Sequence, residues 1–335
     1  MKAIGIKTSH EIDHKESLIE FETNKPIASE FKIVVKVNAV SINPVDTKVR
    51  ANAASNVVLV EPKILGYDGV GIVDSIGEEV TNCKVGDRVF YAGDVTKNGS
   101  NSEFQLIDSR IVALSPTSIN DAQAAVLPLT SLTGWEAMFD RMNIKVDENK
   151  TILIIGGAGG VGSITTQIAK ATTNLTVIAT ASREETSAWC KDMGADVVVN
   201  HRDLVTSVRE AGFQYVDYIF NLADTKIHWD AMSELIAPQG KICSIVDTTE
   251  AVDINKLKSK SVTFIWEFMF TRAMFNTNDI QKQSEILTQI ASLVDEGRIK
   301  TTLSKTIKGF SVDSLKEGHA LTESGKNIGK IAVTF

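Results

Sequence analysis

The chain has 335 residues and a formal net charge of −7, with 43% hydrophobic and 23% charged residues. This balance excludes a disordered chain and provides apolar material for about two globular domains. An acidic chain without a basic run is a poor partner for nucleic acid, and no apolar stretch reaches the length of a membrane span. Because the N-terminus lacks the apolar region of a secretion signal, we expect a cytoplasmic enzyme.

The cysteines and histidines do not predict a metal site. Cys83, Cys190 and Cys243 are far apart in the sequence and form no Cys-x-x-Cys pair, so we expect reduced thiols and no four-cysteine zinc site. His10 and His14 have i, i+4 spacing, but they lie in a polar stretch with no further ligand beside them. We therefore expect no bound metal.

The first part of the chain has the pattern of short β-strands. Residues 32–37 alternate between apolar and polar side chains, and residues 69–76 and 87–91 are further short β-type runs. Glycines separate these runs, as they do at turns between short strands. The density of such strands predicts a β-rich, barrel-like domain.

The pattern changes near residue 121. Helical spacing appears at 122–127 and again after Pro128. Strand and helix segments then alternate as far as residue 246, which predicts a parallel sheet with helices on both faces. Gly194 and the 238–240 stretch are predicted to end the helices that precede them. The predicted strands are 151–155, 175–180, 196–199, 216–221 and 241–246, and the predicted helices are 161–173, 184–193, 204–211 and 228–237.

The alternation stops beyond Lys260. A long amphipathic helix is predicted over 280–296, and a last strand over 329–335. This tail is too small for a separate domain, so we expect it to return to the N-terminal part. The expected organisation is one discontinuous domain of residues 1–121 and 262–335, with an inserted domain of residues 122–261.

A glycine-rich turn, GGAGGVG, follows the buried strand predicted at 151–155. Gly157, Gly159 and Gly162 have the G-x-G-x-x-G spacing that lets a pyrophosphate approach the backbone at the N-terminus of the next helix. A glycine-rich connection without a ligand is the alternative. The repeated strand and helix units around the motif favour a dinucleotide site.

The end of the next predicted strand indicates which dinucleotide binds. An Asp or Glu is expected there when the adenine ribose carries a free 2′-hydroxyl. This chain has Ala181, Ser182 and Arg183 instead. A hydroxyl and a guanidinium suit a 2′-phosphate, so the sequence predicts NADP(H) rather than NAD(H). An ordinary exposed arginine at a helix start is the alternative for Arg183.

Seven stretches, taken together, resemble one protein family: VSINPVDTKVR, ILGYDGVGIVDSIG, VGDRVFYAG, LPLTSLTGWEAMFDR, GGAGGVGSITTQIAK, GADVVVNH and SGKNIGKIAV. Over nearly its full length, the chain resembles the medium-chain dehydrogenase/reductase superfamily. The stretches are most similar to its zinc-free quinone oxidoreductase group, and to the branch of zinc-type alcohol dehydrogenase-like proteins. The resemblance implies an α/β fold, in which an N-terminal GroES-like β-barrel domain joins a doubly wound Rossmann domain with a parallel sheet.

The resemblance also implies chemistry without zinc. Zinc alcohol dehydrogenases carry a ligand Cys where this chain has Ile42 and Asn43, and a ligand His where it has Tyr67. An amide and a phenol are poor zinc ligands. The structural zinc lobe is missing as well, because no cysteine lies between Tyr91 and Ser109.

The expected reaction is hydride transfer from NADPH to a quinone or to the β-carbon of an enone. Asn43 and Tyr67 are predicted to hydrogen-bond the acceptor oxygen, with Thr133 beside the cofactor. The alternatives stay open: Asn43 sets the turn before Pro44, Tyr67 is a packed aromatic, and Asp46 orients backbone. The predicted cofactor contacts are Gly157, Ala158, Gly159, Gly160, Val161, Gly162, Ser182, Arg183, His201, Leu222, Ala223, Ile245, Val246, Asn327 and Lys330; His201 can equally be a surface histidine.

The sequence leaves three functions open. The leading hypothesis is an NADPH-dependent quinone oxidoreductase. The second is an NADPH-dependent alkenal or enone reductase, which uses the same hydride geometry. The third, from another class, is a non-catalytic NADPH-binding sensor or structural protein. A homodimer is expected from the resemblance alone. The aromatic stretch SVTFIWEFMFTRAMF is interpreted either as a substrate wall or as a sheet-edge strand for subunit pairing.

Overall fold

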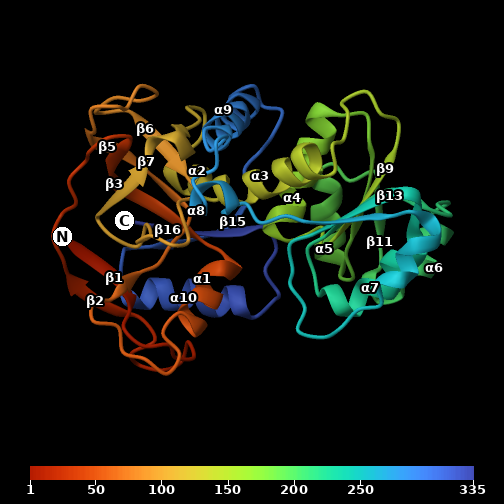
Figure 1. Ribbon diagram of the computed structural model, residues 1–335, viewed down its shortest axis with the longest axis horizontal. Helices are drawn as coiled ribbons and strands as arrows, with labels where there is room; N and C mark the ends of the chain where they lie inside the picture. Colours follow the sequence, from red (N-terminus) through yellow and green to blue (C-terminus); the bar gives the residue numbers. More distant parts are fainter. The chain divides into compact units, whose positions relative to one another are not determined.

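The computed structural model describes residues 1–335, which separate into two compact units (Figure 1). Unit 1 consists of Met1–Leu129, Phe270–Gly297 and Thr301–Phe335, and unit 2 of Thr130–Met269 and Arg298–Lys300. The polypeptide therefore leaves unit 1, forms unit 2, and returns.

The junctions lie later in the chain than the expected boundaries at 121/122 and 261/262. Residues 122–129 belong to unit 1, where helix α2 (Asp121–Ala125) packs against strand β3 (Lys32–Ile42). Residues 262–269 belong to unit 2, because β14 (Thr263–Trp266) pairs in parallel with β13 (Ile236–Ser244). One interpretation of this stretch from the sequence is a sheet-edge strand, but the expected boundary at 261/262 assigns it to the other domain.

Unit 2 is a doubly wound α/β domain on a six-stranded parallel sheet. The strand order β11-β10-β9-β12-β13-β14 places β9 (Thr151–Ile155) inside the sheet, and the later strands extend it on both sides. This confirms the predicted Rossmann-type sheet. Its other strands are β10 (Thr176–Thr180), β11 (Val197–Val199) and β12 (Val216–Asn221); its helices are α4 (Gly160–Thr172), α5 (Glu184–Asp192), α6 (Leu204–Glu210) and α7 (Thr225–Leu235), preceded by α3 (Pro128–Trp135) and a π-helix (Glu136–Arg141).

The residues of β9 form a continuous apolar run because the strand is buried on both faces. Each residue from Ile152 to Ile155 is 0% exposed, as expected for a strand covered by helices on both faces. Helix α4 buries Ile164 and Ile168, which are also 0% exposed. The sheet and its covering helices thus hold the end of β9 and the start of α4 rigidly, and the glycine-rich turn lies between them.

In unit 2, the end of helix α5 agrees with the sequence prediction, whereas both ends of helix α7 differ from it. Gly194 has a φ of +100° and ends α5, as predicted. Helix α7 starts earlier than predicted, because the Asp224 side chain accepts the Ile227 N–H at 2.9 Å. It also ends earlier, and the 238–240 stretch lies in β13, where the pairing with β12 changes register.

Unit 1 contains a seven-stranded and a three-stranded sheet, and an isolated bridge pairs Ala3 of the smaller sheet with Ser102, just before β7. The orders are β15-β16-β3-β5-β6-β8, with β7 also paired to β3, and β2-β1-β4. This is the predicted barrel-like domain. Its elements are β1 (Lys2–Ile6), β2 (Ile19–Glu22), β4 (Lys63–Ile64), β5 (Gly69–Ile76), β6 (Arg88–Tyr91), β7 (Phe104–Asp108), β8 (Val112–Leu114), β15 (Leu303–Lys308), β16 (Lys330–Thr334), α1 (Pro44–Asn52), α8 (Thr271–Met274), α9 (Lys282–Asp295) and α10 (Val312–Glu323).

The C-terminal tail returns to unit 1, as expected. Strand β16 pairs antiparallel with β3, with Ile331 opposite Ile42 and Ala332 opposite Ser41. Ile42, Ile331 and Val333 belong to one buried apolar cluster. This pairing brings Lys330 next to the turn between β3 and α1, although nearly the whole chain separates them in sequence.

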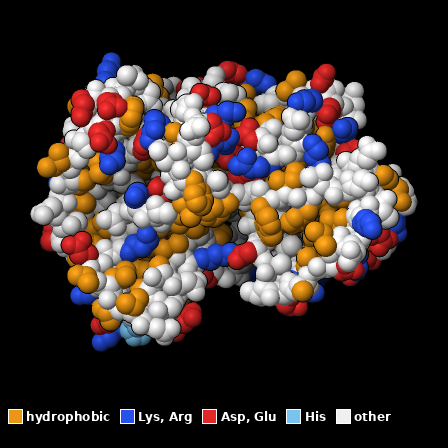
Figure 2. Space-filling view, in the orientation of Figure 1, with side chains coloured by type: hydrophobic (Ala, Val, Ile, Leu, Met, Phe, Trp, Pro, Cys, Tyr) orange, Lys and Arg blue, Asp and Glu red, His pale blue; other side chains and the backbone are white.

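The surface carries mixed charge. On the face shown in Figure 2, acidic and basic side chains are interspersed with hydrophobic ones. No helix of the structure combines the length and the apolar character that a membrane span requires.

Candidate functional site

The glycine-rich turn of unit 2 leads from β9 into α4. Gly156 has a φ of +93°, and its N–H donates to Thr180 Oγ1 at 2.9 Å. Gly159 is the N-cap of α4, and its carbonyl accepts the Ser163 N–H at 2.9 Å. The first N–H groups of a helix have no partner inside it, so those of Gly160 and Val161 face outward. Such an N-terminus suits a phosphate.

The three motif glycines differ in the space around them. A Cβ at Gly162 would lie 2.4 Å from Gly156 O, and one at Gly157 would lie 2.8 Å from Ala179 Cβ. Both positions therefore need glycine for packing. A Cβ at Gly159 would meet only Gly156 O, at an ordinary 3.5 Å. The turn is tight on its protein side and open at Gly159, so it fits a pyrophosphate.

The ends of β12 and β13 lie beside this turn. The Leu222 N–H donates to Ile155 O at 3.0 Å, and the Ile245 N–H donates to Asn221 O at 3.2 Å. Asn221 is 0% exposed, and its Nδ2 donates to Ser244 Oγ at 3.1 Å. This network fixes the backbone of four predicted cofactor residues, Leu222, Ala223, Ile245 and Val246.

Ser182 and Arg183 follow the end of β10, and both are half-buried. Arg183 is the N-cap of α5, and its Nε lies 3.0 Å from Glu185 Oε1, with side chains 38% and 59% exposed. The predicted phosphate-binding guanidinium thus lies beside a carboxylate of its own helix. Sequence reasoning missed Glu185, although it stands only two residues after Arg183.

His201 begins a short 3-10 helix after β11. Its ring meets that of His228 edge-on, with the ring centroids 6.4 Å apart. Partial burial, and secondarily the Arg202 charge, lowers the pKa of His201; burial also lowers the pKa of His228. A neutral His201 can accept a hydrogen bond at pH 7.

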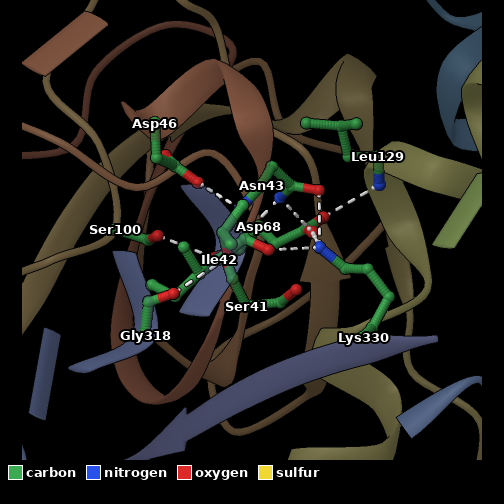
Figure 3. A network of polar contacts seen from close by, with 10 residues as sticks. Ser41, Ile42, Asn43, Asp46, Asp68, Ser100, Leu129, Gly318 and Lys330 are labelled. Atoms are coloured by element: carbon green, nitrogen blue, oxygen red, sulfur yellow. Dashed lines mark hydrogen bonds and ion pairs between the residues drawn. The ribbon is translucent and has the colours of Figure 1, made fainter. Parts of the chain in front are cut away.

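A buried polar cluster lies in unit 1 where β3 ends, α1 begins and β16 starts (Figure 3). Lys330 Nζ donates to Ile42 O and to Asn43 Oδ1, each at 2.6 Å. Asn43 Nδ2 donates to Asp68 Oδ2 at 2.7 Å, and the Leu129 N–H donates to Asp68 Oδ1 at 2.8 Å. Asn43, Asp68 and Lys330 are 1%, 0% and 5% exposed. The Asn43 amide therefore links a buried ammonium to a buried carboxylate.

Asp46 completes this polar cluster from the first turn of α1. Its Oδ2 accepts the Asn43 N–H at 2.7 Å, which is the backbone-orienting contact considered from the sequence. Burial raises the pKa of Asp46 to about 7, against the lowering effects of the Asn43 N–H and the Lys330 charge. Burial also raises the pKa of Asp68 and lowers that of Lys330. Burial disfavours the charged form of each group, and the attraction between the Lys330 ammonium and the two carboxylates opposes this effect.

Tyr67 lies one residue before Asp68 and is 1% exposed. Its ring packs edge-on against Phe270 with centroids 5.5 Å apart, which is the packing contact considered as an alternative role. Its hydroxyl donates to Val95 O at 3.4 Å, long for an O–H···O bond. Burial, and then the charges of Asp46 and Asp94, raises the pKa of the phenol well above its usual range. Tyr67 is therefore protonated at neutral pH.

The remaining predicted residues fall in different units. Thr133 is 4% exposed in α3 of unit 2, and Asn327 is half-buried in the segment before β16 of unit 1. Within unit 1 the structure brings Asn43 and Lys330 together, and within unit 2 it brings the glycine-rich turn to the ends of the neighbouring strands. Asp68 was missed by sequence reasoning, and a carboxylate inside the glycine-rich run GYDGVG was the available signal. No group of three or more His, Cys, Asp and Glu residues is arranged to hold a metal.

Comparisons place this architecture among known proteins. Residues 29–114 match the family described as Alcohol dehydrogenase GroES-like domain, and residues 193–333 match the one described as Zinc-binding dehydrogenase. A zinc-type alcohol dehydrogenase-like protein of Staphylococcus epidermidis (strain ATCC 12228 / FDA PCI 1200) is 45% identical and covers 100% of both chains. A 2-methylene-furan-3-one reductase of Solanum lycopersicum is 26% identical over 94% of this chain and 75% of its own.

Solved structures agree with the fold. A protein of Rhizobium etli CFN 42, solved as a candidate zinc-dependent alcohol dehydrogenase, has a TM-score of 0.95 and 44% identity over 100% of this chain and 98% of its own. The Escherichia coli quinone oxidoreductase complexed with NADPH has a TM-score of 0.84 and 25% identity over 100% of both chains. A GroES-like domain joined to a doubly wound sheet defines a two-domain oxidoreductase. The chain belongs to the medium-chain dehydrogenase/reductase superfamily, in the branch of the zinc-type alcohol dehydrogenase-like proteins.

Proposed function

We propose that this oxidoreductase uses NADPH to reduce a quinone-like acceptor without zinc. The observation that carries the proposal is the glycine-rich turn, open at Gly159 and followed by a strand end with Arg183 and no carboxylate at 181–183. When bound, NADPH supplies a hydride from its nicotinamide ring. The Escherichia coli relative crystallised with NADPH supports this choice of cofactor.

The protein's part in cofactor binding follows from the turn and the strand ends. The N–H groups of Gly160 and Val161 would bind the pyrophosphate, and Arg183 and Ser182 would bind the 2′-phosphate. The strand-end residues Leu222, Ala223, Ile245 and Val246, with His201, would line the rest of the cofactor. Thr133, Asn327 and Lys330 belong to the same proposal by family resemblance.

Support for hydride transfer without zinc comes from the available donor atoms. Asn43 and Tyr67 stand where zinc alcohol dehydrogenases carry Cys and His, and an amide and a phenol bind zinc poorly. Both Asp68 oxygens already accept N–H bonds, and Lys330 Nζ lies 3.9 Å from Asp68 Oδ2, where it would repel a second cation. Elemental analysis of protein purified without chelators tests this, and stoichiometric zinc would overturn it.

Without a Lewis acid, the acceptor must already be electron-poor, which favours a quinone or an enone. Tyr67 is the proposed donor to its oxygen, because the long 3.4 Å contact with Val95 O is readily replaced. Both ends of the Asn43 amide are engaged, so we propose that Asn43 holds Asp68 and Lys330 in place. The protein's remaining task is to orient the two reactants and exclude water.

Two further functions stay in competition. An enone reductase is favoured by the similarity to the tomato 2-methylene-furan-3-one reductase. A non-catalytic NADPH-binding protein would keep the turn and Arg183 without turnover. We also propose a homodimer, supported by the position of β14 at the edge of its sheet: Trp266 at the end of this strand is 51% exposed, and Phe268, two residues further on, is 48% exposed. Light scattering at micromolar concentration tests it, and a monomer would remove it.

Steady-state NADPH oxidation with a panel of quinones and enals separates these functions. We expect turnover with quinones and a lower kcat/KM with linear enals. Higher kcat/KM with enals would favour the enone reductase. NADPH binding without turnover of any acceptor would favour the non-catalytic function, and absence of NADPH binding would overturn all three.

A further inference from the structure

Lys63 shares a hydrogen-bond acceptor with Tyr67 in unit 1. Lys63 Nζ donates to Val95 O at 3.2 Å, and Tyr67 Oη donates to the same oxygen at 3.4 Å. The ammonium and the phenol therefore donate to the same carbonyl oxygen. The distance between Lys63 Nζ and Tyr67 Oη cannot exceed the sum of these two hydrogen-bond lengths. Lys63 lies in β4, four residues before Tyr67, and Val95 lies in the segment after β6, so two separate parts of the chain form this contact.

The charges around the phenol make this contact chemically relevant. Asp46 in α1 and Asp94 beside Val95 both raise the pKa of Tyr67, in addition to burial. A phenol in such surroundings is a weaker acid than usual, because the phenolate would face two carboxylates. Lys63 is the cation that the structure brings to the same carbonyl, and partial burial lowers its pKa against the Asp94 charge. It is half-buried, so its field is less screened by water than that of a surface lysine.

We propose that Lys63 is the positioning cation for Tyr67, placed to stabilise the negative charge that Tyr67 Oη acquires when it protonates the reduced acceptor. This inference rests on the proposed function, since it needs an acceptor that takes a hydride and then a proton. NADPH would supply the hydride by breaking a C–H bond of its nicotinamide ring, which leaves NADP⁺, and the acceptor that takes the hydride with its electron pair would carry an oxyanion. That oxyanion takes the Tyr67 proton, and the phenolate left beside Lys63 is reprotonated by water.

The competing interpretation is that Lys63 merely ties the segment at Val95 to β4. Lys97 provides the matched control, because it is an exposed lysine two residues after Val95, in the same segment. Lys63→Met removes the charge and keeps the length of the side chain, whereas Lys63→Arg keeps the charge. A structural role affects stability and leaves the acid–base behaviour of Tyr67 unchanged.

The first measurement is the pH profile of kcat/KM with the best quinone or enal. Lys63→Met should lower kcat/KM about tenfold at pH 7, since a neighbouring opposite charge shifts a pKa by about one unit or more. It should also remove the alkaline limb of the profile, because Lys63, whose pKa is lowered by burial, loses its charge before Tyr67 ionises. Lys63→Arg should restore most of the activity, and Lys97→Met should match the wild type. In a Tyr67→Phe background, Lys63→Met should cost less than about twofold, because the two residues act through one proton. Full additivity of the two losses would overturn the proposal.

The second measurement does not require turnover. Fluorotyrosine placed at position 67 brings the phenol titration into an accessible range, and its ¹⁹F signal reports the pKa. Lys63→Met should raise that pKa by about one unit, while Lys63→Arg and Lys97→Met leave it unchanged. If no acceptor is turned over, the proposed function fails, yet this titration still decides whether Lys63 governs the Tyr67 phenol. An unchanged pKa in Lys63→Met would overturn the inference even in an active enzyme.

Discussion

The glycine-rich turn of unit 2 and the buried polar cluster of unit 1 hold their groups by opposite means. The turn works through backbone N–H groups and missing side chains, all within residues 156–163. The polar cluster works through side chains, and its hydrogen bonds join residues 25, 61 and 288 positions apart. A backbone site is therefore a property of a short segment, whereas the polar cluster exists only once the whole of unit 1 has folded.

The most direct test of this difference is to replace Lys330, the buried cation of the polar cluster. Lys330→Met should lower the free energy of unfolding by about 3–5 kcal/mol, because it leaves Asp68 and Asp46 buried without their counter-ion. Urea unfolding followed by tryptophan fluorescence measures this. Lys308→Met, at an exposed position of the neighbouring strand β15, should change it by less than about 0.5 kcal/mol.

A second variant checks the reason for that loss. Adding Asp68→Asn to Lys330→Met removes a stranded charge and should recover part of the stability. If Lys330→Met and Lys308→Met cost the same, Lys330 does not hold the cluster together. If the double variant is less stable than Lys330→Met by the full cost of Asp68→Asn alone, the two side chains do not interact.

We expect two glycines of the turn to have different roles: Gly162 in packing and Gly159 in cofactor binding. Gly162→Ala should cost about 2 kcal/mol of stability, because its Cβ would lie 2.4 Å from Gly156 O and 2.7 Å from Gly157 Cα, both backbone atoms. Gly159→Ala should cost less than about 1 kcal/mol, since its Cβ meets only one atom at 3.5 Å. Thermal unfolding without cofactor compares the two.

Cofactor binding should reverse this order. Gly159→Ala puts a methyl group where the pyrophosphate approaches, so the Kd for NADPH should rise about tenfold despite the intact fold. Calorimetric titration of NADPH measures it. Equal affinity for wild type and Gly159→Ala would show that the open side of the turn does not hold the phosphates.

The same contrast explains what the sequence could predict. The alternating strands and helices and the turn of unit 2 follow from hydrophobic periodicity and glycine spacing, which are local. The contact between Lys330 and Asn43 was not predictable, because a hydrogen bond across 287 positions depends on the pairing of β16 with β3. Strand β14 was assigned to the wrong side of the boundary for a related reason, since only its pairing with β13 shows where it belongs. Of the predicted site residues, those outside the turn and the strand end at 181–183 came from family resemblance rather than from local pattern.

Arg183 belongs, like the turn, to the local kind of site, and it should act on cofactor choice alone. Arg183→Ala should raise the Kd for NADPH about tenfold and leave that for NADH nearly unchanged, because NADH has no 2′-phosphate. We expect the lower end of the range for a charge-assisted contact, since the side chain is 38% exposed and pairs with Glu185. Ala181→Asp should go further and favour NADH by repelling the phosphate. Equal losses for both cofactors in Arg183→Ala would show that Arg183 supports the fold and does not contact the phosphate.

The smallest expected effect concerns the pH dependence of the polar cluster. Burial raises the pKa of Asp46 to about 7, so the folded state binds a proton that the unfolded state releases near pH 4. Stability therefore falls as the pH rises from about 4 to about 7, because there the unfolded state binds fewer protons than the folded one. Asp46→Asn lacks this loss and keeps an oxygen for the Asn43 N–H, so between pH 6 and pH 8 it should gain about 1.4 kcal/mol relative to the wild type. Asp295→Asn is the control, because N–H groups of Thr117 and Ser118 lower the pKa of Asp295 to about 2, and its titration ends below this window. Urea unfolding at pH 6 and pH 8 measures both variants, and a constant offset for Asp46→Asn would show that Asp46 is ionised throughout and that Lys330 balances its charge.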